Sequence, residues 1–264
     1  MVASVCRLRL GALLLVLWIV TWLGQPAHAT GDSTGGWLPD AIFIKLFDDS
    51  LKNIQDFARS ESSLNQKAND LESEAYYLMM LAEVAKQTGL NGWSSKVGVL
   101  QAHAADLALA ARRKDLTEVK KQAGLIADLK KPETAGGATP RNLAQAVPIQ
   151  NLMKQVQNLH KKHQDYRRLS AAAFGQRGKT DEIHLAAYRM AVYAIAIHAH
   201  VPTKDLPKDK SAKDWEGACE DMRKACLDIA QAAKAKKQSD VKNSILKLEA
   251  SCNRCHRDFR VDVD

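Results

Sequence analysis

Apolar residues recur three and four positions apart along most of the chain, in runs rich in Ala, Leu, Lys and Gln. This spacing is typical of amphipathic α-helices, and the alternation of apolar and polar residues that marks a half-buried strand is almost absent. The pattern predicts an all-α protein. The expected helices cover residues 39–59, 69–88, 93–113, 116–130, 149–173, 180–199, 212–237 and 239–258.

Two segments with helix-breaking residues interrupt this pattern. Residues 131–140 contain two prolines and a Gly-Gly pair, which makes them a linker by composition. Residues 202–210 contain two further prolines and separate the sixth expected helix from the seventh. The linker divides the helices into two groups of four.

The two groups share a sequence pattern. Residues 93–128 align without a gap with residues 215–250, at an offset of 122, and the apolar positions coincide. Eight identities in 36 columns could come from shared composition alone, but they include the pair Trp93 and Trp215. Duplication is the favoured interpretation, and it predicts two tandem up-and-down four-helix bundles of about 110 residues each.

The start of the last helix carries the same signal in both groups. Thr117 and Ser239 occupy equivalent positions, and each is followed by an acidic residue. A hydroxyl side chain is a preferred N-cap, and an acid in the first turn is favoured by the helix dipole. The two hydroxyl residues are therefore predicted to cap these helices.

The first 29 residues have the three parts of a secretory signal peptide. Arg7 and Arg9 are followed by 13 apolar residues at 11–23 and then by Ala27-His28-Ala29. An uncleaved membrane anchor is the alternative, but a spanning helix needs about 20 apolar residues. The two arginines are not adjacent, which favours export of an unfolded chain. We expect cleavage after Ala29 and a periplasmic location.

Composition narrows the class of the mature chain. Hydrophobic residues make up 46% of the sequence, with 14 Gly and 7 Pro, which excludes a disordered or collagen-like protein. The net charge of +8 falls to +6 when residues 1–29 are removed, and aromatic residues are only 6%, which does not favour a nucleic-acid partner. The four cysteines that remain are too few for a disulfide scaffold.

Residues 252–256 read Cys-Asn-Arg-Cys-His, the C-x-x-C-H pattern of covalent haem attachment. Thiols three positions apart on a helix share one face, so Cys252 and Cys255 can bond two vinyl groups on one edge of a porphyrin. His256 then supplies the proximal iron ligand. The two thiols continue an apolar stripe, which directs the haem to the bundle interior; the stripe contains Val241, Ile245, Leu248 and Phe259.

Two other kinds of site use similar cysteine pairs. A redox C-x-x-C normally begins a helix after a strand, whereas this pair ends a helix in an all-α chain. A zinc site needs a fourth ligand and usually a second Cys/His pair. The export signal, the helical pattern and the position of His256 together favour haem c.

The residues around this motif resemble a known family. Residues 246–260, LKLEASCNRCHRDFR, are similar to the end of cytochrome c′ and its Met-ligated relatives, which are class II c-type cytochromes. Both have a Leu and a small residue before the first Cys, and an aromatic residue and an Arg three and four positions after the His. Trp215 also fits. The resemblance covers residues 148–261 and implies a four-helix bundle with one covalent haem c.

The first half resembles the family only as a degenerate copy, over residues 39–131. Lys130, Pro132, Glu133 and Thr134 stand at the motif positions, so this half cannot attach haem by the same chemistry. One haem is therefore expected in total. The expected organisation is a signal peptide at 1–29, a haem-less bundle at 30–131, a linker at 132–147 and a haem-binding bundle at 148–264.

The second axial ligand decides between two functions. In an up-and-down bundle the end of the last helix lies beside the start of the first, where Met153, His160 and His163 are candidates. The Met-ligated relatives carry their ligand early in this helix, as the resemblance of Leu152-Met153-Lys154 implies, and Met153 is the favoured prediction. Phe43-Ile44-Lys45 offers no ligand at the equivalent place. A histidine ligand, a vacant position and simple core packing of Met153 stay open.

Ligation by His256 and Met153 predicts electron transfer, because Met raises the reduction potential and little rearranges on reduction. A vacant position predicts instead a five-coordinate haem that binds NO or CO, as cytochrome c′ does. No pair resembles the distal acid and base of a peroxidase, so no enzymatic activity is expected.

Other charged residues have secondary expected roles. Arg257 and Arg260 could pair with the haem propionates or be solvated. The lysines between 204 and 247 are expected to form a solvated face that could steer an acidic redox partner. A homodimer and a docking role for the haem-less half also stay open.

Two pairs of candidate ligands have structural interpretations. Cys219 and Cys226 are seven positions apart, about 10.5 Å along a helix, which is too far for a disulfide, so they are expected to be buried. His198 and His200 are two positions apart and are expected to face different surroundings rather than to share a metal.

Overall fold

The computed structural model describes residues 36–132, 137–201 and 210–259, and every regular element in these ranges is helical. The all-α prediction is confirmed, and each expected helix is present. The long helices are α1 (Asp40–Phe57), α2 (Glu61–Thr88), α3 (Val97–Arg113), α4 (Leu116–Asp128), α6 (Ile149–Arg167), α8 (Lys179–His198), α9 (Ala212–Lys234) and α10 (Gln238–Phe259). The short elements are η2 (Ser94–Lys96), α5 (Leu143–Ala146) and α7 (Ala171–Phe174).

Several helix boundaries differ from the prediction, and a local cap explains the start of α2. α2 begins at Glu61 rather than at 69, since the Ser60 hydroxyl accepts the backbone N–H of Ser63 at 3.2 Å. The helix expected at 149–173 ends at Arg167.

The segment 1–29, assigned to the signal peptide, lies outside the described residues. Among the residues that are described, no helix combines the length and apolar character of a membrane span.

The caps predicted at Thr117 and Ser239 are wrong. α4 begins at Leu116, and its cap is Asp115, whose carboxylate accepts an N–H of the first turn at 3.0 Å. α10 begins at Gln238, so both hydroxyl residues lie inside their helices. A carboxylate caps a helix as well as a hydroxyl does, and in α4 the Asp115 carboxylate occupies this position.

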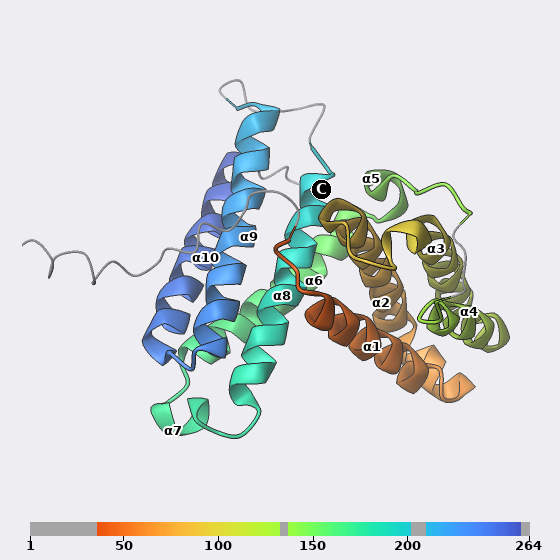
Figure 1. The fold of residues 1–264 in the computed structure, drawn as a ribbon, viewed down its shortest axis with the longest axis horizontal. Helices are drawn as coiled ribbons and strands as arrows, with labels where there is room; N and C mark the ends of the chain where they lie inside the picture. Colours follow the sequence, from red (N-terminus) through yellow and green to blue (C-terminus); the bar gives the residue numbers. More distant parts are fainter. Residues whose placement is uncertain (1–35, 133–136, 202–209, 260–264) are drawn as a thin grey trace, which may run out of the picture. The chain divides into compact units, whose positions relative to one another are not determined.

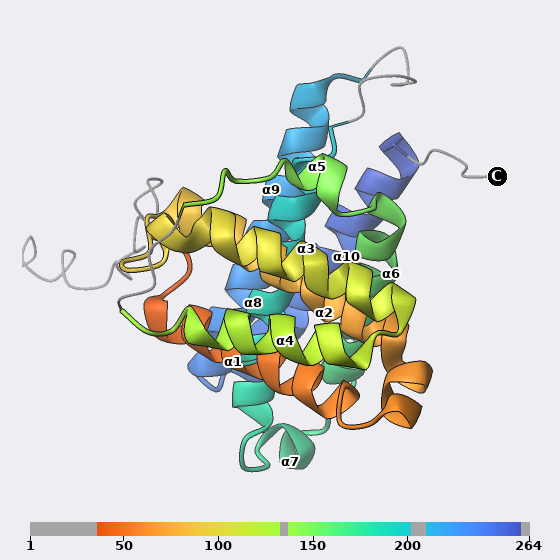
Figure 2. The same cartoon turned by 90° about the vertical axis from the view of Figure 1, so that its right-hand side faces the viewer.

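Helix contacts close into two rings (Figures 1 and 2). In the first ring, α1, α2, α3 and α4 contact one another in order, and α4 returns to α1. In the second ring, α6, α8, α9 and α10 do the same. α10 starts beside the end of α6, where the Gln238 amide donates to the Leu169 carbonyl at 2.8 Å, so these two helices run in opposite directions. The end of α10 therefore lies along the earlier part of α6.

α2 of the first ring also contacts α8 of the second ring. Residues 74–82 of α2 and 190–194 of α8 are buried without interruption. A helix that is buried on all sides loses the polar stripe of a surface helix. The two rings therefore share a packed boundary.

Equivalent positions of the two rings have the same backbone conformation. α1 and α6 each follow a proline, Pro39 and Pro148, with φ of −63°. α3 and α9 are each followed by a lysine in the left-handed region, Lys114 and Lys236, both with φ of 56°. Such a conformation is uncommon for residues other than glycine. The two lysines are separated by the same 122 positions that align the sequences.

Candidate functional site

The C-x-x-C-H residues occupy the last two turns of α10. Cys252 and Cys255 are half-buried and pack against the hydrophobic core, as the apolar stripe predicts. His256 is exposed. Val241, Ile245 and Leu248, which precede the thiols on this stripe, are fully buried. The two sulfurs therefore lie on the side of α10 that faces the second ring.

Aromatic packing fixes the end of α10. The Phe259 ring meets the Trp215 ring edge to face, with centroids 5.3 Å apart and planes at 86°. The Trp215 indole in turn donates to the Ile197 carbonyl at 3.1 Å. The start of α9 and the end of α8 thus hold the helix turn that carries the motif.

Burial keeps both motif thiols protonated. Burial raises the pKa of Cys252 to about 11, and the neighbouring Cys255 raises it further. Burial also raises the pKa of Cys255, and the nearby Asp258 carboxylate adds to this shift. Reactive redox cysteines and zinc ligands are thiolates, which need the opposite shift. These surroundings do not favour a redox pair.

The two cysteines of α9 are buried, as expected, and each lies beside a motif cysteine. Burial raises the pKa of Cys219 to about 12 and that of Cys226 well above its ordinary value. The neighbouring Cys255 raises the pKa of Cys219 further, and the neighbouring Cys252 raises the pKa of Cys226 further. The sequence did not predict this proximity, because it depends on how α9 and α10 align.

The facing helix α6 presents all three candidate ligands on one side. Met153 is half-buried and packs against the hydrophobic core, His160 is half-buried and His163 is fully buried. The Nε2 atoms of both histidines are buried without a hydrogen-bond partner in the described part of the chain. Unpaired buried nitrogens are uncommon and call for an explanation.

His163 is held as a neutral imidazole. Its Nδ1 lies 2.7 Å from the Leu159 carbonyl oxygen, which can only accept, so Nδ1 carries the proton. Burial lowers the pKa of His163 to about 4, against the effect of this hydrogen bond. At neutral pH its Nε2 therefore has a free lone pair.

The predicted charged residues are on the surface. Arg257 is exposed and its Nε donates to the Asp258 carboxylate at 3.1 Å; Arg260 lies outside the described residues. Most lysines in the described part of the segment 204–247 are exposed, as predicted. Its exposed members are Lys213, Lys224, Lys234, Lys236, Lys237 and Lys247.

The equivalent end of the first ring is closed. α4 stops at Asp128, which aligns with Ala250, just before the motif positions. The Lys96 ammonium is buried and donates to the carbonyls of Leu129 and Lys131, both at 2.7 Å. Aromatic rings fill the adjacent space: Trp93 packs on Phe43 and Phe47 with centroids 4.9 and 4.8 Å apart.

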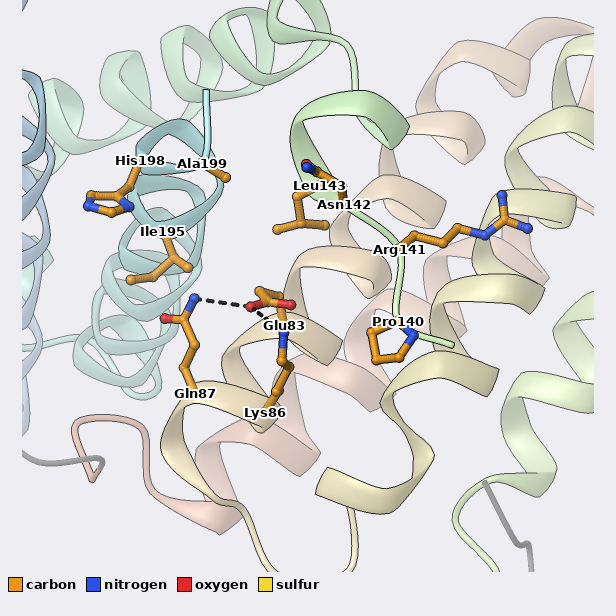
Figure 3. Close-up of a pocket in the computed structure, with 10 residues that line it drawn as sticks. All are labelled: Glu83, Lys86, Gln87, Pro140, Arg141, Asn142, Leu143, Ile195, His198 and Ala199. Carbon is orange, nitrogen blue, oxygen red and sulfur yellow. Dashed lines mark hydrogen bonds and ion pairs between the residues drawn. The ribbon is translucent and has the colours of Figure 1, made fainter. Parts of the chain in front are cut away.

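His198 and His200 face different surroundings, as predicted. Both ring nitrogens of His200 lie 2.8 Å from carbonyl oxygens, those of Ala196 and Val147. His198 is exposed and lines a pocket of about 350 Å³ with Glu83, Lys86 and residues 140–143 (Figure 3). Among the described residues, no three His, Cys, Asp or Glu side chains are grouped to hold a metal ion.

Comparison of the chain with protein-family models, with curated proteins and with solved structures finds no match. The chemistry of the site is therefore assigned from its own residues.

Proposed function

We propose that the chain is an exported monohaem c-type cytochrome that transfers electrons. The observation that carries this proposal is the donor set at the end of α10. Cys252 and Cys255 are protonated thiols on the core-facing side of one helix, and His256 follows directly. Across from them, α6 carries buried imidazole nitrogens that have no hydrogen-bond partner among the residues the structure describes. Two thiols, an adjacent imidazole and a facing donor are the groups that haem c requires.

The second ring is the haem-binding bundle in this proposal. The two rings are tandem up-and-down four-helix bundles of the cytochrome c′ type, related by duplication. Two features shared by the rings support this relationship. A proline precedes both α1 and α6, and a lysine with a left-handed backbone conformation follows both α3 and α9. The first ring attaches no haem, because α4 stops before the motif positions and Lys96 caps its carbonyls.

Each residue of the motif has a separate role. The Cys252 and Cys255 sulfurs each form a bond to one vinyl carbon while the thiol hydrogen passes to the other, so attachment consumes no oxidant or reductant. His256 would hold the iron of this haem, and Met153 of α6 is the second ligand that the sequence predicts. A haem iron held by these residues would supply one-electron redox chemistry, which fits a carrier rather than an enzyme.

The surroundings of α9 and α10 suit an exported redox carrier. The exposed lysines form a face that attracts an acidic partner protein, and salt weakens such attraction. The signal at residues 1–29 directs the chain to the periplasm before haem is attached.

The mass and spectrum of the purified, exported protein test this function. We expect the denatured chain to keep the mass of one haem and its Soret absorbance after extraction with acid acetone. A low-spin spectrum in both oxidation states supports electron transfer. A high-spin spectrum that changes on addition of NO supports the five-coordinate alternative instead. An unmodified mass overturns both.

A further inference from the structure

We propose that Cys219 of α9 and Cys255 of α10 form a disulfide bond in the exported chain before haem is attached. The bond joins the two helices and withdraws the Cys255 sulfur from thioether formation. The pairing follows from the packing of α9 against α10, whereas its effect on haem attachment rests on the proposed function.

Contacts along the whole length of the two helices agree on how α9 and α10 align. The helices run side by side in opposite directions (Figure 1). Three contacts between side chains hold them: Lys247 with Asp228, Arg254 with Asp221, and Phe259 with Trp215. From the first pair to the second, α10 advances seven residues and α9 goes back seven. The alignment is therefore the same from the turn to the far end.

This alignment places Cys219 and Cys255 at the same level. Cys255 precedes Phe259 by four residues, and Cys219 follows Trp215 by four, so each thiol is about one helical turn from the aromatic contact. Cys226 and Cys252 are less well matched. Cys226 lies three or four residues from the level of Cys252, which is about 5 Å along the axis. The alignment therefore favours the pair Cys219 and Cys255.

The two backbones approach closely beside this pair. Ser251 is four residues before Cys255, and its Oγ donates to the main-chain carbonyl of Ala218 at 3.4 Å. A serine side chain is short, so it reaches the backbone of the other helix only where the helices are close. Both Ser251 and Ala218 are buried. A disulfide requires Cα atoms within about 7 Å, and small residues at the interface allow such an approach.

Both thiols lie on the packed side of their helices. Cys219 is 4% exposed, and Cys255 is half-buried and packs against the hydrophobic core. In the first ring Val97 occupies the position equivalent to Cys219, and it is 2% exposed. Valine fills this core position, so packing alone does not require a thiol there. The cysteine occurs in the ring that carries the C-x-x-C-H motif.

The oxidation needs an external disulfide as the oxidant. The Cys255 sulfur is the more exposed, so it attacks that disulfide first, forms a mixed disulfide and releases one thiol. Cys219 then attacks the Cys255 sulfur and releases the second thiol, and the two cysteine protons pass to the released thiols. Two cysteines are oxidised while one disulfide is reduced. Compartments outside the cytoplasm supply such oxidants, and a thiol reductant restores Cys255 for haem attachment.

Peptide mapping of the exported, haem-free chain tests the pairing. Trypsin places the four cysteines of the mature chain in four separate peptides, 214–223, 225–234, 248–254 and 255–257. The chain is purified from a host that does not attach haem c, and circular dichroism checks its fold. It is then equilibrated with oxidised and reduced glutathione and alkylated. We expect a mass lower by two hydrogens and a linked pair of peptides 214–223 and 255–257.

Two variants make this result specific. Cys219→Val, which introduces the residue of the first ring, should abolish the linked pair and leave Cys255 alkylated. Cys226→Ala changes another buried thiol of α9 and should keep the linked pair. Linkage of Cys255 to Cys252 or Cys226 instead overturns the pairing. So does complete alkylation of Cys219 in oxidised glutathione.

Material from a host that attaches haem c tests the consequence. Molecules that carry the mass of one haem should contain Cys219 as an alkylated thiol, and haem-free molecules should contain the linked pair. Equal alkylation of Cys219 in both fractions overturns the competition with haem attachment. If no molecule carries haem, the proposed function fails, and the glutathione experiment still decides whether the disulfide forms.

Discussion

Arg189 of α8 and Glu74 of α2 form a buried ion pair between the two rings. The guanidinium donates to the Glu74 carboxylate at 2.6 Å and lies over the Tyr77 ring, 4.0 Å from its centroid. The same carboxylate accepts hydrogen bonds from Ser50 at 2.7 Å and from Asn53 at 3.0 Å. Glu74 is 8% exposed, so these three partners, rather than water, surround its carboxylate.

Removing Glu74 should therefore destabilise the protein strongly. Glu74→Ala leaves the Arg189 charge buried without its partner, which costs about 3–5 kcal/mol. The expected result is a lower urea midpoint with an unchanged slope. Asp70→Ala is the matched control, because the Lys67–Asp70 pair is about half exposed and such pairs contribute about 1 kcal/mol or less. Similar losses in the two variants would contradict the importance of burial.

Two helical glycines should respond to alanine in opposite ways. A Cβ at Gly98 in α3 would collide with the backbone of Ala138, whereas one at Gly124 in α4 meets nothing within 4 Å. Gly98→Ala should therefore lower the free energy of unfolding by about 1–3 kcal/mol, the cost of overpacking. Gly124→Ala should raise it by about 0.5–1 kcal/mol, through helix propensity. Urea unfolding of the two variants measures both, and a stabilised Gly98→Ala would refute the close approach.

The helices and the place of the C-x-x-C-H residues at the end of the last helix were predictable because both are local signals. Periodicity located all eight long helices, and the motif needs only five consecutive residues. What the sequence could not give is the alignment of one helix against another. That alignment places Cys226 near Cys252 and His160 near His256. It depends on tertiary ion pairs such as Arg167–Glu249, whose partners are 82 positions apart.

Acid should weaken the protein through His163. Its folded pKa of about 4 lies below the ordinary value of 6.5, because burial disfavours the charged ring. Between these values the unfolded chain binds a proton that the folded chain does not, so stability falls as the pH is lowered from 6.5 to 4. The loss from this group is about 3 kcal/mol.

His163→Asn isolates this contribution. Asn keeps a side-chain donor for the Leu159 carbonyl but does not titrate. Urea unfolding at several pH values should show a flatter dependence in the variant across this window. Parallel profiles for the two proteins would show that His163 is not the buried neutral group described above.

The four cysteines of the mature chain should separate into two functional pairs. Under the proposed function, Cys252→Ala and Cys255→Ala should each remove one thioether, and the double variant should release haem into acid acetone, because no covalent bond would remain. Cys219→Ala and Cys226→Ala are the matched controls: burial raises the pKa of these thiols too, and they lie near the motif thiols, but on α9. Each control should keep the mass of one haem and lose only about 1 kcal/mol or a little more of stability from the cavity. Haem staining of denatured gels and intact mass distinguish the pairs. If Cys226→Ala lost covalent haem while Cys252→Ala kept two thioethers, the attachment would run through α9, and the assignment of the α10 motif would fail.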